Sequence, residues 1–222
     1  MLTGLPPMVC SRTRLLILGS FPGAASLAAQ QYYGHPQNHF WRILQAIWPS
    51  SPIGTGADSY KIRSEWLLDR RLGLWDVYAA CEREGSLDTS IRKPLLNDFA
   101  SMQSLCPELQ AIAHNGGESF KHSRHVRLAL SDIERSAEPP QTSSAPSGLE
   151  PAAPNLLEQV WTGDRGEASR EPRPARPRAA HAVASVGVQF HKLPSTSPAN
   201  ASWSFERKLA AWREVFEKHG MI

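Results

Sequence analysis

The sequence predicts an α/β protein: a three-layer α/β/α sandwich built around a central four-stranded parallel sheet. Short apolar runs, of which Leu15-Leu16-Ile17-Leu18 is the clearest, are typical of strands buried on both faces of a parallel sheet. These runs alternate along the chain with longer segments whose apolar residues recur at helical spacing. Such alternation is typical of a parallel sheet that is covered by helices on both faces.

The first third of the chain is expected to contain two strands and two main helices. We predict a helix where apolar residues recur three or four positions apart, and a strand where they are continuous. Pro, Gly and Ser mark the intervening loop. In order, the expected elements are a polar lead-in at 1–13, a strand at 14–18 that ends at Gly19, a helical turn at 26–31, a helix at 40–48 on Phe40, Ile43, Leu44 and Ile47, a loop at 49–57, a helix at 60–71 on Ile62, Trp66 and Leu67, and a strand at 72–77.

The rest of the chain repeats the pattern, and a long segment of different composition interrupts it. A serine just before the last helix, Ser202 or Ser204, is suited to cap its first turn. In order, the expected elements are a loop at 81–90 with mixed charges and Gly85, a helix at 95–105 on Leu95, Leu96, Phe99, Met102 and Leu105, a strand at 109–113, a helix at 118–130, a strand at 183–193 with Val186, Val188 and Phe190, and a last helix from 205 on Phe205, Leu209, Trp212, Val215 and Phe216.

The interrupting segment, 132–181, is rich in Pro, Ser, Ala, Arg and Glu. Eight of the 18 prolines of the chain lie between Pro139 and Pro177, and Trp161 is the one aromatic residue between Phe120 and Phe190. Such a composition buries too little apolar surface to offset the entropy lost on ordering. We therefore interpret 132–181 as a disordered insert within one domain that spans 1–222, with a brief helix at 156–161.

The composition limits the possible classes of function but does not identify the function. A net charge of +3 permits a polyanionic partner, and 41% hydrophobic content is enough for one sizeable core. The three cysteines, Cys10, Cys81 and Cys106, form no CxxC pair, so they favour a reduced compartment and predict neither a metal nor a cofactor. No apolar run is long enough for a bilayer and no secretory pattern is present. We therefore expect a monomeric cytoplasmic protein, nucleoid-associated if bacterial, without a membrane partner.

Four loops that follow the predicted strands should meet at one edge of the sheet, where open α/β sheets bind ligands. They are 20–38, 76–88, 114–117 and 194–200. None contains a Walker loop, a GxGxxG fingerprint, an HExxH motif or a GxSxG elbow. Their aromatic, amide, carboxylate and hydroxyl groups are better suited to a planar, hydrogen-bonding ligand than to a phosphorylated metabolite alone.

Six segments in these loops and strands, in this order, resemble the motifs of one family. They read LGSFPG, QYYGHPQNHFW, LGLWDV, REGSLDTSI, HNGG and LPSTSPANA. They are similar to those of the uracil-DNA glycosylase superfamily, and most similar to its hypoxanthine-DNA glycosylase (deoxyinosine-excising) branch. The resemblance covers nearly all of the chain except the insert. It implies cofactor-free hydrolysis of the N-glycosidic bond of a deaminated base flipped out of DNA, by a monofunctional repair enzyme.

The resemblance implies a catalytic role for Asn38, whose amide could position the attacking water. In mismatch-specific relatives an asparagine stands just before the Pro-Gly of the first motif, and Phe21 replaces it here. Phe21 cannot orient water, although its ring could pack on a flipped base. The alternatives are that Asn38 only caps the following helix and that Phe21 belongs to the core.

The resemblance also implies which residues recognise the base. A flipped base needs a stacking platform, and Tyr33 is the candidate, with Tyr32 left as a packing residue. Hypoxanthine presents an oxygen acceptor and a ring N–H donor. Asn115 could donate to the oxygen, and Asp76 could accept from the ring N–H. The alternatives are a core role for Tyr33, a loop-capping role for Asp76 and a turn role for Asn115.

The last motif implies contacts with DNA beside the lesion. Ser195, Thr196 and Ser197 could bind phosphates, helped by free amides before the last helix. Ala199 and Asn200 should lie near the tip that inserts into the strand. The alternative for the hydroxyl residues is plain loop solubility.

The leading hypothesis is excision of hypoxanthine from deoxyinosine in DNA. A rival within the family is excision of uracil or xanthine. From other classes, a non-catalytic nucleic-acid-binding module would bind DNA without producing abasic sites, and a small-molecule enzyme would cleave free deoxyinosine as well as it cleaves DNA.

Overall fold

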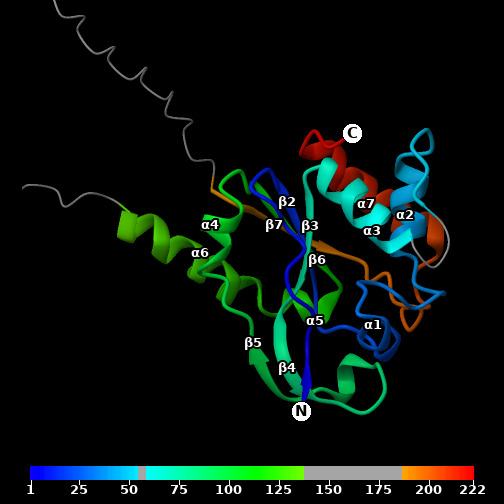
Figure 1. Ribbon diagram of the computed structural model, residues 1–222, viewed down its shortest axis with the longest axis horizontal. Helices are drawn as coiled ribbons and strands as arrows, with labels where there is room; N and C mark the ends of the chain where they lie inside the picture. The colour runs from blue at the N-terminus through cyan, green and yellow to red at the C-terminus, as the bar shows by residue number, and fades with distance from the viewer. Residues whose placement is uncertain (55–58, 138–186) are drawn as a thin grey trace, which may run out of the picture. The chain divides into compact units, whose positions relative to one another are not determined.

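The computed structural model of the chain describes residues 1–54, 59–137 and 187–222 (Figure 1). The predicted insert therefore lies almost entirely outside the described residues, as does the brief helix expected at 156–161. One boundary is corrected. Helix α6 (Ser123–Ala137) runs six residues into the segment predicted to be disordered, because helical geometry continues past the last apolar position of 118–130.

A four-stranded parallel sheet forms the centre of the molecule, as the sequence predicts. Its order is β3-β2-β6-β7, and each neighbouring pair is parallel. Every residue of the first three of these strands along the chain is buried, which explains the unbroken apolar run of β2 and the mainly apolar sequences of β3 and β6. The strands are β2 (Leu15–Gly19), β3 (Leu72–Asp76), β6 (Ala111–Asn115) and β7 (Gln189–Leu193).

Helices cover the two faces of this sheet (Figure 1). The sheet separates two hydrophobic cores, one on each face. Alternate residues of β2 point to opposite faces, so Leu15 and Ile17 join one core, and Leu16 and Leu18 join the other. The first core is completed by α2 (Phe40–Ile47), α3 (Ser59–Asp69) and α7 (Phe205–Lys218), and the second by α4 (Met102–Leu105) and α6. The shorter α1 (Ala24–Ala29) and α5 (Gly117–Phe120) follow β2 and β6.

A second, antiparallel sheet was not predicted. It consists of β1 (Leu2–Thr3), β4 (Tyr78–Glu82) and β5 (Arg92–Leu96), in the order β1-β4-β5. The predicted lead-in, loop and helix at these positions are therefore wrong in part. All five residues of β5 are exposed, including Leu95 and Leu96. Those leucines did not mark a buried helix face, and the helix expected at 95–105 is reduced to α4.

The last helix begins as the sequence predicts. Ser204 is the N-cap of α7, and its hydroxyl oxygen accepts from the Arg207 backbone N–H at 3.3 Å. Glu206 follows in the first turn and Lys218 lies in the last, so both charges complement the helix dipole. Within the described ranges, none of the helices has the length and apolar character required to cross a bilayer.

Candidate functional site

The carboxyl ends of three parallel strands bring a carboxylate, an amide and a phenol together. Gly19 ends β2 and is paired in register with Asp76, which ends β3, while Asn115 ends β6 on the other side. Gly19 has no side chain, and a Cβ built there would collide with Asp76 Oδ1 and lie 3.8 Å from Tyr33 Oη. The carboxylate and the phenol therefore meet above the backbone of Gly19.

Replacing Gly19 with alanine is expected to destabilise the protein by about 1–3 kcal/mol, the usual cost of overpacking. The new methyl group would displace the Asp76 carboxylate, which is held by buried surroundings. Urea unfolding of both proteins would measure the difference. Gly117→Ala is the matched control, because nothing lies within 4 Å of a Cβ at that position. Equal unfolding midpoints for Gly19→Ala and wild type would contradict the close approach.

Asp76 is a buried carboxyl group with an unfavourable environment for its charge. Its exposed fraction is 5%, and Oδ2 has no hydrogen-bond partner among the described residues. Burial, helped by the nearby Asp88 carboxylate and opposed by Arg83, raises the pKa of Asp76 to about 7. The group therefore changes its charge near neutral pH, which is frequent at functional sites.

Asn115 ties the site to the loop that follows β7. Its Nδ2 donates to Tyr33 Oη at 3.1 Å and to Thr196 Oγ1 at 3.0 Å, and its Oδ1 accepts from the Thr196 backbone N–H at 2.9 Å. Both amide hydrogens are therefore engaged. Thr196 has no exposed surface, so the structure does not present it to a phosphate, unlike its two serine neighbours. Its role is to lock the loop against β6.

Tyr33 presents its hydroxyl group to the site and one ring face to the core. It adopts a left-handed backbone conformation with φ of 54°, and its ring stacks on Phe40 with centroids 3.8 Å apart. Burial and the Asp76 charge raise the pKa of Tyr33, so the phenol remains protonated. Because Phe40 covers one face, only the opposite face could stack on a base.

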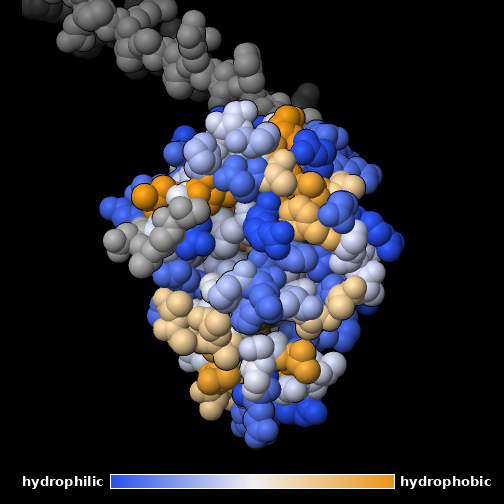
Figure 2. Space-filling view, turned by 90° about the vertical axis from the view of Figure 1, so that its right-hand side faces the viewer, coloured by the Kyte–Doolittle hydropathy of each residue, from blue (hydrophilic) through white to orange (hydrophobic). Residues whose placement is uncertain are grey.

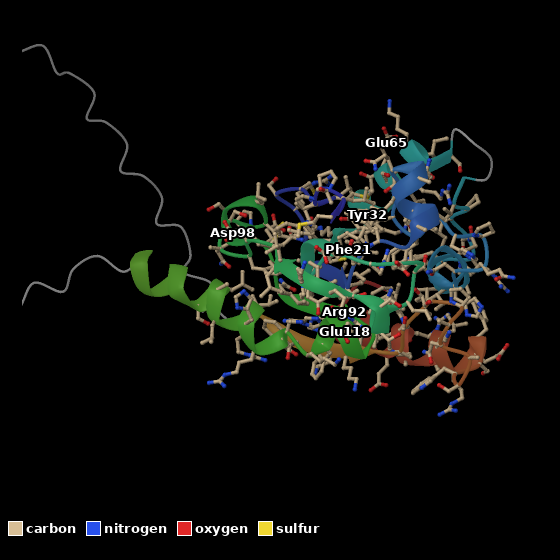
Figure 3. All side chains as sticks on the ribbon, turned by 90° about the horizontal axis from the view of Figure 1, so that it is seen from below. Phe21, Tyr32, Glu65, Arg92, Asp98 and Glu118 are labelled. Carbon is tan, nitrogen blue, oxygen red and sulfur yellow. The ribbon has the colours of Figure 1, made fainter. Side chains whose placement is uncertain are left out.

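Tyr32 is a packing residue, as the sequence predicts. It is 4% exposed, and its hydroxyl group lies 3.2 Å from the Leu5 carbonyl and 3.0 Å from that of Pro6. Phe21 is likewise in the interior (Figure 3). It belongs to the core on the α4 and α6 side of the sheet, where Arg83 lies over its ring, whereas Tyr33 packs against the opposite core. The structure thus favours the core alternative for Phe21 and does not group it with Tyr33.

Asn38 lies at the start of α2, partly exposed. Its Oδ1 accepts from the Phe40 backbone N–H at 2.9 Å, which satisfies one of the free amides of the first turn. An amide oxygen has a second lone pair, so this bond leaves room for another donor. The next residue, His39, donates its backbone N–H to the Thr196 carbonyl at 3.0 Å. The Asn38 segment is therefore joined to the locked loop.

The loop at 195–200 holds its own shape through short-range bonds. Ser195 Oγ accepts from the Ser197 N–H, and Ser197 Oγ accepts from the Ala199 N–H, both at 3.2 Å. Asn200 Nδ2 donates to the Ser195 carbonyl at 3.0 Å. The two serine hydroxyl groups act here as acceptors, so each keeps its own O–H to donate to an anion. Ala199 is exposed beside the partly exposed Asn200.

The contacts of the loop at 83–90 with the candidate site were not predicted from the sequence. The loop at 83–90 is fastened to the turn after β2: Ser20 Oγ donates to Asp88 Oδ1 at 2.6 Å, and the Ala24 N–H donates to Ser86 Oγ at 3.0 Å. Arg83 donates to the Pro22 carbonyl and lies over the Phe21 ring. The REGSLDTSI motif, which forms this loop, did indicate that the loop belongs to the site. The motif did not indicate which residue each of its polar side chains would contact.

Comparisons with known proteins show which proteins the chain is similar to. The model of the uracil DNA glycosylase superfamily matches residues 6–216. Two curated relatives, from Methanosarcina barkeri and Methanosarcina acetivorans, are both named hypoxanthine DNA glycosylase. They are 40% and 36% identical over 126 residues, which make up 56% of this chain and 77% of each relative.

A solved structure shows the same architecture. It is a solution NMR structure from Methanosarcina acetivorans, described provisionally as a uracil DNA glycosylase. It is 27% identical, and the match covers 98% of both chains with a TM-score of 0.61. This likeness confirms the predicted fold class.

Proposed function

Because the chain belongs to the uracil-DNA glycosylase superfamily, we propose that it hydrolyses the N-glycosidic bond of deoxyinosine in DNA. The products are free hypoxanthine and an abasic site. The observation that carries the proposal is the convergence of Asp76, Tyr33 and Asn115 above Gly19, where a buried acceptor and buried donors share one edge of the sheet. The names of the two curated relatives support the choice of base.

The candidate site offers a partner for each of the two polar groups on the edge of hypoxanthine. The Asp76 carboxylate accepts from the ring N–H, since Oδ2 has no other partner among the described residues. Asn115 already donates both amide hydrogens, one of them to Tyr33 Oη. The Tyr33 O–H is therefore free to donate to the base oxygen, and Asn115 orients it. This arrangement adds Tyr33 to the hydrogen-bonding groups and leaves Asn115 as its support.

Hydrolysis requires a positioned water and stabilisation of a cationic sugar more than a strong base. We assign the water to the Asn38 amide, whose Oδ1 is held at the start of α2 by the Phe40 N–H. The partner is DNA that contains deaminated bases. Ser195 and Ser197 contact phosphates beside the lesion, and Ala199 and Asn200 enter the space that the flipped nucleotide leaves.

The surface around this site supports a polar partner. Figure 2 shows the side of the molecule that carries α1, α2 and the start of α7, and its centre is largely hydrophilic. The proposed site needs no residue from a second copy of the chain, and we propose that the enzyme acts as a monomer. It acts in the compartment that holds the genome, which is the cytoplasm in a bacterium or archaeon.

A panel of duplexes, each with a single lesion, tests the proposed function. The wild-type protein is expected to release hypoxanthine from the deoxyinosine duplex faster than it releases uracil or xanthine from the matched duplexes. Alkali treatment reveals each abasic site as a strand break. Faster release of uracil or xanthine would change the assigned base. No abasic product with any lesion would indicate a binding module, and equal cleavage of free deoxyinosine would indicate a small-molecule enzyme.

A further inference from the structure

A groove next to the candidate site has basic walls that neither the fold nor the proposed chemistry requires. It encloses about 500 Å³ between the segment around the start of α2 and the segment around the start of α7. Its basic lining residues are His39, Arg42 and Lys208, and its aromatic lining residues are Trp203 and Phe205. Three basic side chains from two distant segments therefore face one space.

Lys208 is the least expected of these residues. It is 1% exposed, although lysine is seldom fully buried without a partner. Within the described part of the chain, its ammonium group makes one hydrogen bond, to the Ser197 carbonyl at 3.5 Å, which is longer than an ordinary N–H···O bond. An ammonium group has three hydrogens to donate. Burial accordingly lowers the pKa of Lys208. The ammonium group is held in place, yet it has donors to spare.

The other two basic groups are positioned by one aromatic ring. The His39 ring meets the Phe205 ring edge-on with centroids 5.4 Å apart, and the Arg42 guanidinium lies 5.0 Å from the centroid of Phe205. His39 Nδ1 is buried and has no partner among the described residues. Among the described residues, the carboxylate that acts on His39 is Glu206, which is bound by backbone and hydroxyl donors at the N-terminus of α7. It therefore only partly offsets the positive charge.

Hydrogen bonds join the walls of the groove to the candidate site. The His39 N–H donates to the Thr196 carbonyl, and Thr196 is locked to Asn115. Asn38 is adjacent to His39, and Asn200 lines the groove while bonding to Ser195. A strand whose base reaches the candidate site would therefore carry its backbone close to these same two loops.

We infer that this groove binds a backbone phosphate of the lesion-containing DNA strand, with Lys208, Arg42 and the His39 ring as its donors. The inference rests on the proposed function, because DNA supplies the phosphate. It assigns the tightest phosphate contact to the start of α7, rather than to the hydroxyl groups of the 195–197 loop alone. A phosphodiester oxygen would give the Lys208 ammonium group the partner it lacks in the free protein.

The test compares Lys208→Met with wild type in binding to an undamaged duplex at several salt concentrations. Methionine fills the buried space without a charge. The variant is expected to bind about ten-fold more weakly, as for loss of one charged hydrogen bond. The slope of log K against log salt should become less steep by roughly 0.9. Lys218→Met is the matched control, because it lies in the last turn of the same helix, roughly 15 Å away along the axis; it should bind like wild type.

A second set of duplexes locates the phosphate. Each carries a non-hydrolysable deoxyinosine analogue, which fixes the register of the protein, and one neutral methylphosphonate at a different position of the same strand. At one position wild type should lose about ten-fold in affinity, and Lys208→Met should lose much less, because its contact is already gone. If Lys208→Met does not fold, the exposed Arg42→Gln takes its place in both experiments. A wild-type salt slope in the variants, or equal sensitivity at every position, would overturn the inference. Binding to undamaged DNA needs no excision, so the result is independent of whether hypoxanthine is released.

Discussion

Replacing Asp76 with asparagine is expected to stabilise the folded protein at alkaline pH and to remove its preference for deoxyinosine. The carboxyl group is 5% exposed, and its pKa is raised from 3.8 to about 7, mainly by burial. A shift of about three pKa units corresponds to a penalty of up to roughly 4 kcal/mol once the group is charged. Asparagine keeps the shape of the side chain and never carries the charge.

The direction of the pH effect follows from the two pKa values. Between about pH 4 and pH 7 the folded state holds a proton that the unfolded state has lost, so wild-type stability falls as pH rises through this range. The asparagine variant does not lose stability in this way. Its free energy of unfolding should therefore exceed that of wild type by little near pH 4 and by the full amount above about pH 8. Denaturant unfolding of both proteins at pH 4.5 and pH 8.5 would measure the difference.

Asp69→Asn is the matched control, because that carboxylate is 72% exposed in a surface pair with Arg12 and its removal should change stability little at either pH.

The excision rate should depend on pH in the opposite direction to the stability of the wild-type protein. Wild-type release of hypoxanthine should rise as pH increases through about 7, because only the ionised carboxyl group accepts from the ring N–H, and the variant should lack this rise. Equal stability of Asp76→Asn and wild type at pH 8.5 would show that the buried charge is compensated by something else.

The central sheet could be predicted because burial on both faces leaves a direct mark on the sequence. Leu15 to Leu18 are apolar without interruption, since each of them faces one core or the other. The second sheet leaves no such mark. Leu95 and Leu96 lie on an exposed edge strand, and their spacing with Phe99 and Met102 imitates a helix face. An apolar pattern reports burial only when the strand or helix is in fact buried.

The sequence predicted where the residues of the candidate site lie, but it predicted few of the contacts between them. The strand ends bring Asp76 and Asn115 to one edge, which follows from parallel topology alone. The engagement of both Asn115 hydrogens by Tyr33 and Thr196 depends on how the loop after β7 folds back. Hydrogen bonds between residues some eighty positions apart in the chain are settled by tertiary packing, which no local pattern encodes.

Replacing Asn38 is expected to have the largest effect on excision. The structure gives this residue a capping bond to the Phe40 N–H, and the proposed mechanism gives it the attacking water. Serine separates the two roles, because its hydroxyl group can accept from the Phe40 N–H two residues on, although more weakly than an amide, but is too short to reach the same water. We expect Asn38→Ser to fold with nearly wild-type stability and to release hypoxanthine about 10²-fold more slowly or worse under single-turnover conditions.

Asn38→Ala completes the comparison, because it removes both the cap and the amide. It should lose about 1 kcal/mol of stability and as much of the excision rate as the serine variant. Thermal unfolding and single-turnover release, measured on the same preparations, keep the two effects apart. If Asn38→Ser retained the wild-type rate, Asn38 would be a helix cap alone. The carboxylate that Ser20 holds at 2.6 Å, Asp88, would then be the next group to test as the one that positions the water.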